Sequence, residues 1–355
     1  MKKHQRHFIP AVSAILAMLM TFGIVLGCTP ADQNGPEKTG EAVATEDNST
    51  PEPEKAKVIA HWKLQDADGC YTGSVDDDSI GFKDLSGNGN DLIVKTAGNG
   101  DQLDIFSWDR DVDPSVQKFS SGLKFNNTKA LAATVDPYKA SETAYSGGYT
   151  SGKYLETVKT APINSYTFPS GVSVEVIFKL SPELDNDYNR YTGLFSRQGV
   201  IEEQNEPPFS IAISEWNDDN TGVIGENKTW LQLLIMNDFS RLNTEMDEIL
   251  IGANEWHHVL VTLEDTGKVF VWLDGVKLYE AWSGFAELHC TNPNFSWEVG
   301  VGRKSGTDHA SDSKNENVAE GMIRRLFAGT IAEIRMLDRP VTVEESLYPV
   351  EFQGK

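Results

Sequence analysis

The chain has 355 residues, with 53 acidic against 31 basic side chains and a formal net charge of −22 at pH 7. Nucleic acids and anionic lipid head groups are unsuitable partners for so acidic a chain, because binding to them begins with cations that neutralise phosphates. The acidity fits solubility and the binding of a cation equally well.

The N-terminus has the layout of an export signal. Basic residues precede an uncharged apolar run from Phe8 to Leu26, and Gly27-Cys28 and a polar segment follow. This ending resembles the lipobox of bacterial lipoproteins, in which the cysteine is acylated and begins the mature chain. The alternative is a transmembrane anchor, since the run has about the length that a bilayer requires. We expect residues 1–27 to be a lipoprotein signal peptide and Cys28 to carry the lipid. The protein would then be exported and anchored to the cell envelope, with the lipid as its membrane contact.

Residues 28–57 are rich in Pro, Asp, Glu, Thr and Asn and contain almost nothing that could be buried, which predicts a flexible tether. From Val58 to about residue 350, short β-type segments alternate with Gly, Asn and Asp turns, and no long amphipathic helix interrupts them. This pattern predicts one all-β domain, a two-sheet antiparallel β-sandwich or jelly roll. The expected strands are Val58–Leu64, Asp91–Lys95, Gly122–Phe125, Val172–Leu180, Thr192–Arg197, Phe209–Glu215, Thr229–Asn237, Glu248–Gly252, three within Trp256–Glu280, Trp297–Gly302 and Phe327–Leu337.

The clearest strand signal is the stretch Trp256–Glu280, where apolar and other residues alternate on both sides of a Gly-bearing turn. Asp274-Gly275 supplies the left-handed residues that a two-residue hairpin turn needs. His257 and His258 are neighbours on one strand, so they face opposite sides and cannot both bind one metal. Trp256 and Trp272 are expected in the core.

Two polar stretches, Ala133–Tyr166 and Arg303–Arg325, are expected to be insertions between strands. Long loops on a rigid sandwich often carry binding sites, although a solvated loop is the commoner explanation. Cys70 and Cys290 remain as an even pair in an exported protein, which predicts a disulfide; two buried free thiols are the alternative.

Several short blocks occur in order along the folded region, and together they cover nearly all of residues 58–347. They are His61-Trp62-Lys63-Leu64, Asp84-Leu85-Ser86-Gly87-Asn88-Gly89-Asn90-Asp91, Gly122-Leu123-Lys124-Phe125, Val172-Ser173-Val174-Glu175-Val176-Ile177-Phe178, Gly193-Leu194-Phe195-Ser196, Trp256-His257-His258-Val259, Leu273-Asp274-Gly275, and Phe327-Ala328-Gly329-Thr330-Ile331-Ala332-Glu333-Ile334-Arg335 with Leu337 and Asp338-Arg339-Pro340. The set resembles bacterial LamG-like (laminin G-like) domains of the concanavalin A-like lectin/glucanase superfamily. The resemblance implies a jelly roll of two antiparallel sheets, and it motivates carbohydrate as the ligand.

The turn that begins at Asp84 is a candidate metal site. Gly and Asn allow several carbonyls to converge there, and carboxylates supply the hard oxygen ligands that calcium prefers. Similar domains often hold calcium in their loops, which implies a structural Ca²⁺ ligated by Asp84, Asn88 and Glu333. The alternative is a tight turn satisfied by its own backbone hydrogen bonds.

Aromatic side chains beside polar ones are the expected arrangement for sugar binding, because the C–H faces of sugars stack on aromatic rings and their hydroxyls form hydrogen bonds with polar groups. Aromatics that close the sandwich are the alternative. The candidate ligand-binding residues, in or next to loops of the middle strands, are Tyr188, Arg190, Tyr191, Trp216, Asn217 and Trp230.

Glucanases of the same superfamily use carboxylates that alternate along one strand. Glu245 and Asp247 alternate in this way, but the next position on that face is Ile249, so the catalytic set is incomplete. We therefore expect a non-catalytic module that binds a glycan. A surface adhesion subunit that docks a partner protein and a divergent glycoside hydrolase are the alternatives.

Overall fold

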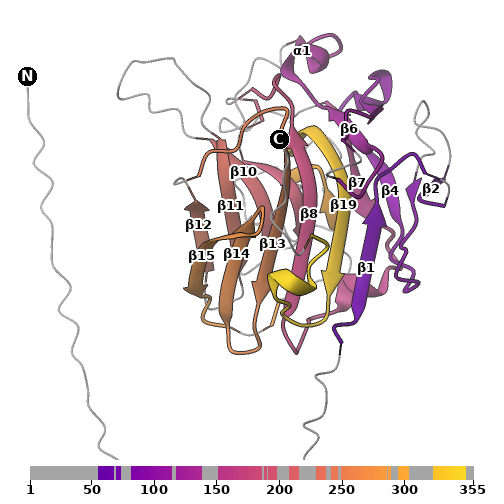
Figure 1. The fold of residues 1–355 in the computed structure, drawn as a ribbon. Helices are drawn as coiled ribbons and strands as arrows, with labels where there is room; N and C mark the ends of the chain where they lie inside the picture. Colours follow the sequence, from indigo (N-terminus) through magenta and orange to yellow (C-terminus); the bar gives the residue numbers. More distant parts are fainter. Residues whose placement is uncertain are drawn as a thin grey trace, which may run out of the picture. The chain divides into compact units, whose positions relative to one another are not determined.

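Two antiparallel β-sheets stack face to face, which confirms the predicted all-β sandwich (Figure 1). The computed structural model describes residues 55–67, 69–72, 81–113, 117–137, 151–185, 188–189, 191–197, 208–215, 229–236, 241–246, 249–285, 287–288, 295–303 and 323–348. The predicted signal peptide and nearly all of the predicted tether lie outside these residues, so their boundaries stay predictions. Within the described ranges, no helix is both long and apolar enough to cross a membrane.

The first sheet has eight strands among the described residues, and it faces the viewer in Figure 1. Its β19 pairs with β8 on one side and with both β6 and β1 on the other. The order is β15 (Val276–Trp282), β14 (Lys268–Leu273), β13 (Trp256–Leu263), β8 (Val172–Leu180), β19 (Ala328–Leu337), β6 (Gly122–Asn126) and β5 (Phe106–Asp109), with β1 (Val58–Lys63) also on β19.

The second sheet has nine described strands and lies behind the first. Its order is β12 (Arg241–Met246), β11 (Thr229–Met236), β10 (Phe209–Glu215), β9 (Thr192–Arg197), β16 (Trp297–Val299), β7 (Gly152–Thr157), β4 (Leu92–Ala97), β3 (Gly81–Phe82) and β2 (Tyr71–Thr72). Among the described residues, the short helical elements are α1 (Lys129–Ala132) and the 3₁₀ turns Gly100–Gln102, Pro162–Ser165 and Val343–Glu345.

The core between the sheets follows from the period-two pattern of the strands. In β14, Val269, Val271 and Leu273 point inward and are buried, while the residues between them face outward. At the centre, the rings of Phe195 and Trp297 stack with centroids 5.0 Å apart. Burying each such ring contributes about 2–3 kcal/mol of hydrophobic stabilisation.

A separate hairpin lies outside the second sheet. Gly300 adopts φ = +79°, and a Cβ there would approach a carbon of the Phe125 ring to 2.6 Å, so this turn requires glycine. The chain leaves the sheet at this point and forms β17 (Val301–Arg303), which pairs with β18 (Arg324–Leu326). The predicted strand Trp297–Gly302 is therefore two strands in two different sheets.

The predicted meander Trp256–Glu280 is confirmed as β13, β14 and β15. Asp274 and Gly275 have φ of +54° and +80°, as the hairpin turn requires. The Asp274 carboxylate also accepts the backbone N–H of His258 at 2.8 Å and contacts Nδ1 of His257 at 2.8 Å. The turn therefore positions both histidines, which face opposite sides as expected.

Three expectations about individual elements were wrong. The stretch Ala133–Tyr166 is more than an insertion, because it contains β7, which pairs with β4 and β16 inside the second sheet. The predicted strand Glu248–Gly252 lies downstream of the true strand β12, which ends at Met246. Trp272 is only partly buried and faces outward, whereas Trp256 is buried as expected.

Candidate functional site

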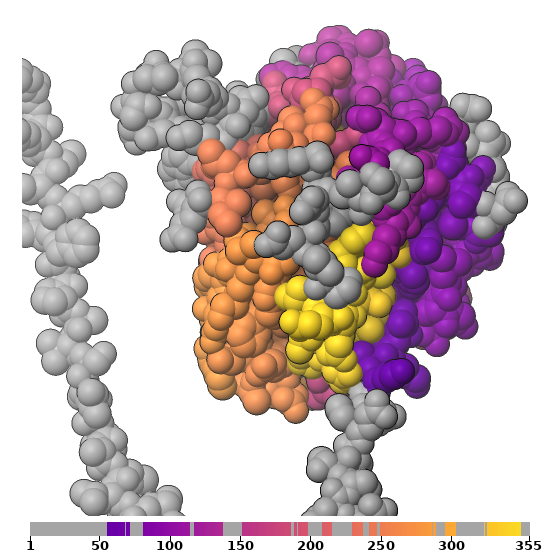
Figure 2. All heavy atoms as spheres, viewed as in Figure 1, coloured from indigo at the N-terminus to yellow at the C-terminus, as the bar shows by residue number. Residues whose placement is uncertain are grey.

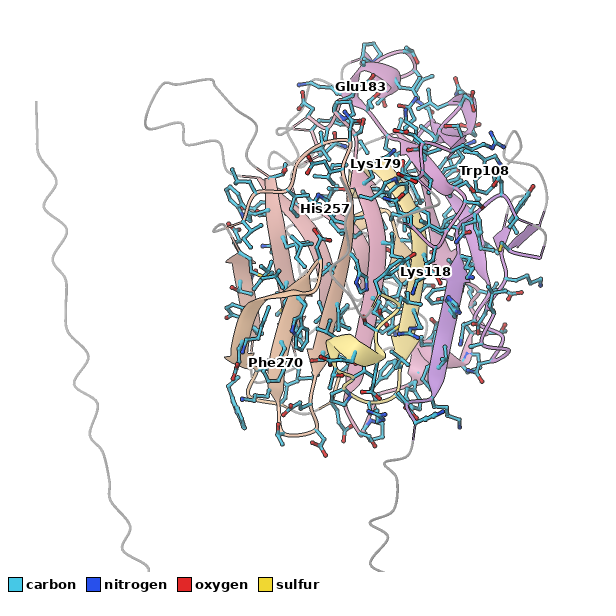
Figure 3. All side chains as sticks on the ribbon, viewed as in Figure 1. Trp108, Lys118, Lys179, Glu183, His257 and Phe270 are labelled. Carbon is cyan, nitrogen blue, oxygen red and sulfur yellow. The ribbon has the colours of Figure 1, made fainter. Side chains whose placement is uncertain are left out.

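A cavity of about 480 Å³ opens at the end of the sandwich that carries α1. One wall comes from α1 and the turns after it, and the other comes from the connection between β8 and β9. Figure 3 shows Glu183 at this end of the fold, next to the α1 region. We call this cavity the loop-end pocket; its lining residues are Thr128, Lys129, Ala130, Ala133, Pro137, Glu183 and Asp185.

The helical wall of the pocket is set by local sequence. The Thr128 side chain caps α1 by accepting the Leu131 N–H at 3.3 Å. Ala130 and Ala133, three positions apart, lie on one face of the turn. Their small side chains, with Pro137, give this wall an apolar surface.

The charged groups of the pocket are few. Lys129 Nζ lies 3.6 Å from Asp185 Oδ2, and both side chains keep over a third of their surface exposed, so this ion pair is weak. Asp185 Oδ1 also accepts the N–H of Tyr188 at 2.8 Å. The Glu183 carboxylate is exposed and has no ion pair or hydrogen bond within the described part of the chain. The pocket therefore offers one open carboxylate and one carboxylate–ammonium pair beside an apolar wall.

Two buried amides hold this end of the fold in place. The Asn189 amide donates to the carbonyls of Asn127 and Leu326, at 3.0 and 2.8 Å. Asn127 in turn donates to the carbonyls of Lys153 and Phe327, at 2.9 and 3.0 Å. Because these bonds join segments far apart in the chain, they hold Asn189 of the β8–β9 connection in place beside the pocket. Neither asparagine stands in a distinguishing motif, so neither could be recognised from the sequence.

Tyr188 lies behind the pocket wall, packed on Ala132 and Ala133 and only 1% exposed. Burial, with the charges of Asp136 and Asp185 nearby, raises the pKa of Tyr188 far above its ordinary value. Its hydroxyl has no hydrogen-bond partner within the part of the chain that the structure describes. Among the predicted ligand residues, Tyr188 thus supports the pocket from behind and does not offer a ring face to solvent.

Tyr191 and Trp230 are at the same end of the second sheet. Tyr191 directly precedes Thr192 of β9, which pairs with Ile213 of β10. The next residue of β10, Ser214, pairs with Trp230 of β11. The Arg325 guanidinium lies 5.0 Å from the Tyr191 ring centroid. Trp230 is buried, and neither its Nε1 nor the Ser214 hydroxyl has a hydrogen-bond partner among the residues described. The other predicted ligand residues, Arg190, Trp216 and Asn217, lie outside the described residues.

The predicted metal ligand Asp84 is held by backbone donors. Its Oδ1 accepts the N–H groups of His61 and Ser86, at 3.1 and 3.0 Å, and its Oδ2 accepts that of Asn90 at 3.0 Å. Asn88 uses its amide to donate to the carbonyls of Val58 and Ile59. This is the hydrogen bonding of a tight Asx turn.

The structure does not bring Glu333 to that turn as a ligand. Its carboxylate lies 2.6 Å from Nε2 of His61 instead. Among the described residues, no three His, Cys, Asp or Glu side chains gather in a way that could hold a metal ion. The contacts of Asp84, Asn88 and Glu333 therefore do not fit a bound calcium, and calcium at this turn stays a prediction.

The predicted disulfide finds no support. Cys70 is a free, buried thiol, and burial raises its pKa. Its predicted partner, Cys290, lies outside the described residues, as does Cys28. Glu245 of the hydrolase alternative faces outward on the edge strand β12, opposite Gln232, while Asp247 falls outside the described ranges.

Comparison with known proteins gives remote likeness only. No protein-family model and no curated protein matches this chain. Among solved structures, domain 4 of AbnA, a GH43 extracellular arabinanase from Geobacillus stearothermophilus solved with arabinotriose, is 15% identical, with a TM-score of 0.44 over 82% of this chain and 97% of that one. The binding domain of Paraclostridial Mosquitocidal Protein 1 is 11% identical, with a TM-score of 0.44 over 81% of this chain and half of the other. The CBM40 of the Ruminococcus gnavus IT-sialidase, bound to α2,6 sialyllactose, is 12% identical, with a TM-score of 0.34 over 50% of this chain and 80% of that one.

Proposed function

We propose that the domain is a non-catalytic module that binds a glycan at the loop-end pocket. The observation that carries the proposal is the pocket itself. Its volume, about 480 Å³, is in the range of small-ligand sites, and it combines an apolar wall with a few polar groups. An open carboxylate, Glu183, can accept two hydroxyl hydrogens, while the Lys129 ammonium can donate to a third oxygen. The alanine and proline wall accommodates the C–H face of a sugar ring.

The charge of the site selects among glycans. Two carboxylates against one ammonium give the pocket a negative balance, and the whole chain carries a net charge of −22. Uronic and sialic acids would be repelled by this field. The proposed ligand is therefore a neutral or amino sugar.

Titration calorimetry with neutral oligosaccharides tests this proposal. We expect Glu183→Gln and Lys129→Ala each to weaken binding about tenfold, the worth of about one charged hydrogen bond. Asp101→Asn, on a turn outside the pocket, serves as a charge-matched control and should leave binding unchanged. Equal affinity in the wild type and all three variants, or tighter binding of acidic sugars, would contradict glycan binding at the loop-end pocket.

The cell-envelope location is part of the same proposal. The N-terminal pattern supports export and acylation of Cys28, which would leave the sandwich on a tether of residues 28–57. Labelling with an alkyne fatty acid should mark the wild-type protein and not Cys28→Ser. Label retained by the variant would contradict the lipid anchor.

A further inference from the structure

Three aromatic side chains line the outward face of the eight-stranded sheet at its β15 edge. We call Phe270, Trp272 and Trp282 the aromatic strip. Val269, Val271 and Leu273 of β14 point into the core, so the residues between them face outward. Trp282 of β15 pairs with Lys268, which puts its side chain on the same outward face. Trp282 comes ten positions after Trp272 and twelve after Phe270 in the chain, and the pairing of β14 with β15 brings it beside them.

Phe270 and Trp272 are partly buried, whereas Trp282 is open to solvent. Trp272 packs against Leu260, Leu337 and Val341, and Phe270 stacks on Trp272 with centroids 5.5 Å apart and an interplanar angle of 27°. Trp282 is 62% exposed, the highest value among the exposed large apolar side chains of the described residues. Its diagonal neighbour on β14 is Phe270, a relationship that places side chains about 7–8 Å apart.

Charged groups lie directly beside the rings. The Glu280 carboxylate pairs with Lys268 at 2.7 Å and with Lys277 at 2.8 Å. Both ammonium groups also lie over the Phe270 ring, 5.0 and 5.8 Å from its centroid. These side chains are solvent-exposed, so their hydrogen-bonding groups are accessible next to apolar ring faces.

We infer that the aromatic strip is a second glycan-binding surface, along which a neutral polysaccharide chain binds. The exposed Trp282 ring can stack against the C–H face of a sugar, the partly buried Phe270 and Trp272 rings extend the apolar surface beside it, and the three charged side chains can hydrogen-bond sugar hydroxyls. The choice of a neutral glycan follows from charge: two ammonium groups and one carboxylate, with Glu264 at the preceding turn also close enough to act on Lys268, come close to balance in a strongly acidic protein. A neutral polymer meets no net repulsion there.

The strip and the loop-end pocket are at opposite ends of the sandwich. Figure 3 shows Phe270 near the lower end of β14 and Glu183 at the upper end of the fold, and Figure 2 shows the β13–β15 region as a broad surface beside the C-terminal segment. The inference takes only its ligand class, a glycan, from the proposed function. Two sites on one chain would raise the avidity for a polymer over that for a short oligosaccharide.

Native affinity electrophoresis of the full chain in gels of galactomannan, xyloglucan or mixed-linkage β-glucan tests the strip. We expect at least one of these polymers to retard the wild-type protein, and Trp282→Ala and Phe270→Ala to raise the apparent Kd about tenfold or more. Trp282→Tyr, which keeps a ring, should restore most of the binding. Val276→Ala is the matched control, because Val276 is an exposed apolar residue of the same strand without a ring.

A second readout distinguishes stacking from altered folding. Polymer should protect the exposed Trp282 indole from acrylamide quenching in the wild type, and Trp282→Phe should lose that protected component. The inference is overturned if no polymer retards the wild type, if Trp282→Ala binds as well as Val276→Ala, or if Trp282→Ala instead abolishes self-association measured by light scattering. We expect Glu183→Gln to weaken the binding of oligosaccharides and to leave retardation by the polymer in place. A failure of the strip proposal and a failure of the pocket proposal therefore appear in different measurements.

Discussion

The Glu175 carboxylate and the His258 imidazole lie 3.0 Å apart on the outward face of the eight-stranded sheet, and neither side chain reaches solvent. The second Glu175 oxygen accepts from Arg335 Nε at 2.8 Å, and the first also accepts the Leu347 N–H at 2.7 Å. A charged group so deeply buried is tolerated only because each oxygen is hydrogen-bonded. Glu175 therefore ties the C-terminal segment to the face of the sheet.

Glu175→Gln should destabilise the domain strongly. The amide keeps the shape of the side chain but leaves the Arg335 charge without its counterion, a loss of about 3–5 kcal/mol in free energy of unfolding by urea. Lys83→Ala removes the exposed Lys83–Asp91 pair and should cost less than about 1 kcal/mol. Equal effects of the two changes would contradict this role of Glu175.

The same carboxylate should make the domain sensitive to acid. Burial alone would raise the pKa of Glu175, but the hydrogen bond and charge of His258 and the charge of Arg335 hold it below its ordinary value of 4.5. A group whose pKa is lower in the folded state contributes stability above its unfolded pKa, and that contribution is lost as pH falls through the folded value. The wild-type Tm should therefore drop below about pH 4.5, and Glu175→Gln should show a shallower drop. If the Tm of both proteins falls equally with pH, other carboxylates cause the acid sensitivity.

Asp84→Ala should destabilise the domain with or without calcium. Three backbone N–H groups lose their acceptor, and we expect a cost of about 3 kcal/mol, since hydrogen bonds to a charged group are worth about 1.5–3 kcal/mol each and solvent replaces some of them. Melts in calcium and in chelator separate the two explanations of this turn. If calcium binds there, the wild-type Tm differs between the two buffers and the variant Tm does not. A variant as stable as the wild type would contradict the hydrogen-bonding role.

The sequence predicted the scaffold better than the site, for physical reasons. The alternation in β13 and β14 and the Asp274-Gly275 turn are local signals, so the meander could be read directly from the chain. The strand β7 was missed because its residues, Gly152–Thr157, include Gly, Lys, Glu and Thr; partners on both sides bury them and complete the strand. No local pattern reports such pairing.

The aromatic strip was missed for a related reason. Period-two alternation shows which residues share a face but not which face is the core, and Trp272 was therefore assigned inward. The position of the opposite sheet decides which face is buried, and that sheet covers Val271 and not Trp272. In the same way, Tyr188 was a candidate for an exposed ring because it stands in a loop, but packing against α1 buries it.

Tyr188→Phe should stabilise the domain, which is unusual for a change at a buried residue. The phenol hydroxyl is buried and has no hydrogen-bond partner among the described residues, and leaving such a group unbonded costs about 1–3 kcal/mol relative to an apolar one. Phenylalanine keeps the packing on Ala132 and Ala133, so we expect a gain of about 1 kcal/mol in free energy of unfolding. Because the ring supports the pocket wall from behind, oligosaccharide binding should remain unchanged, whereas Tyr188→Ala should weaken both stability and binding. A loss of binding in Tyr188→Phe at full stability would instead show that the hydroxyl itself contacts the ligand.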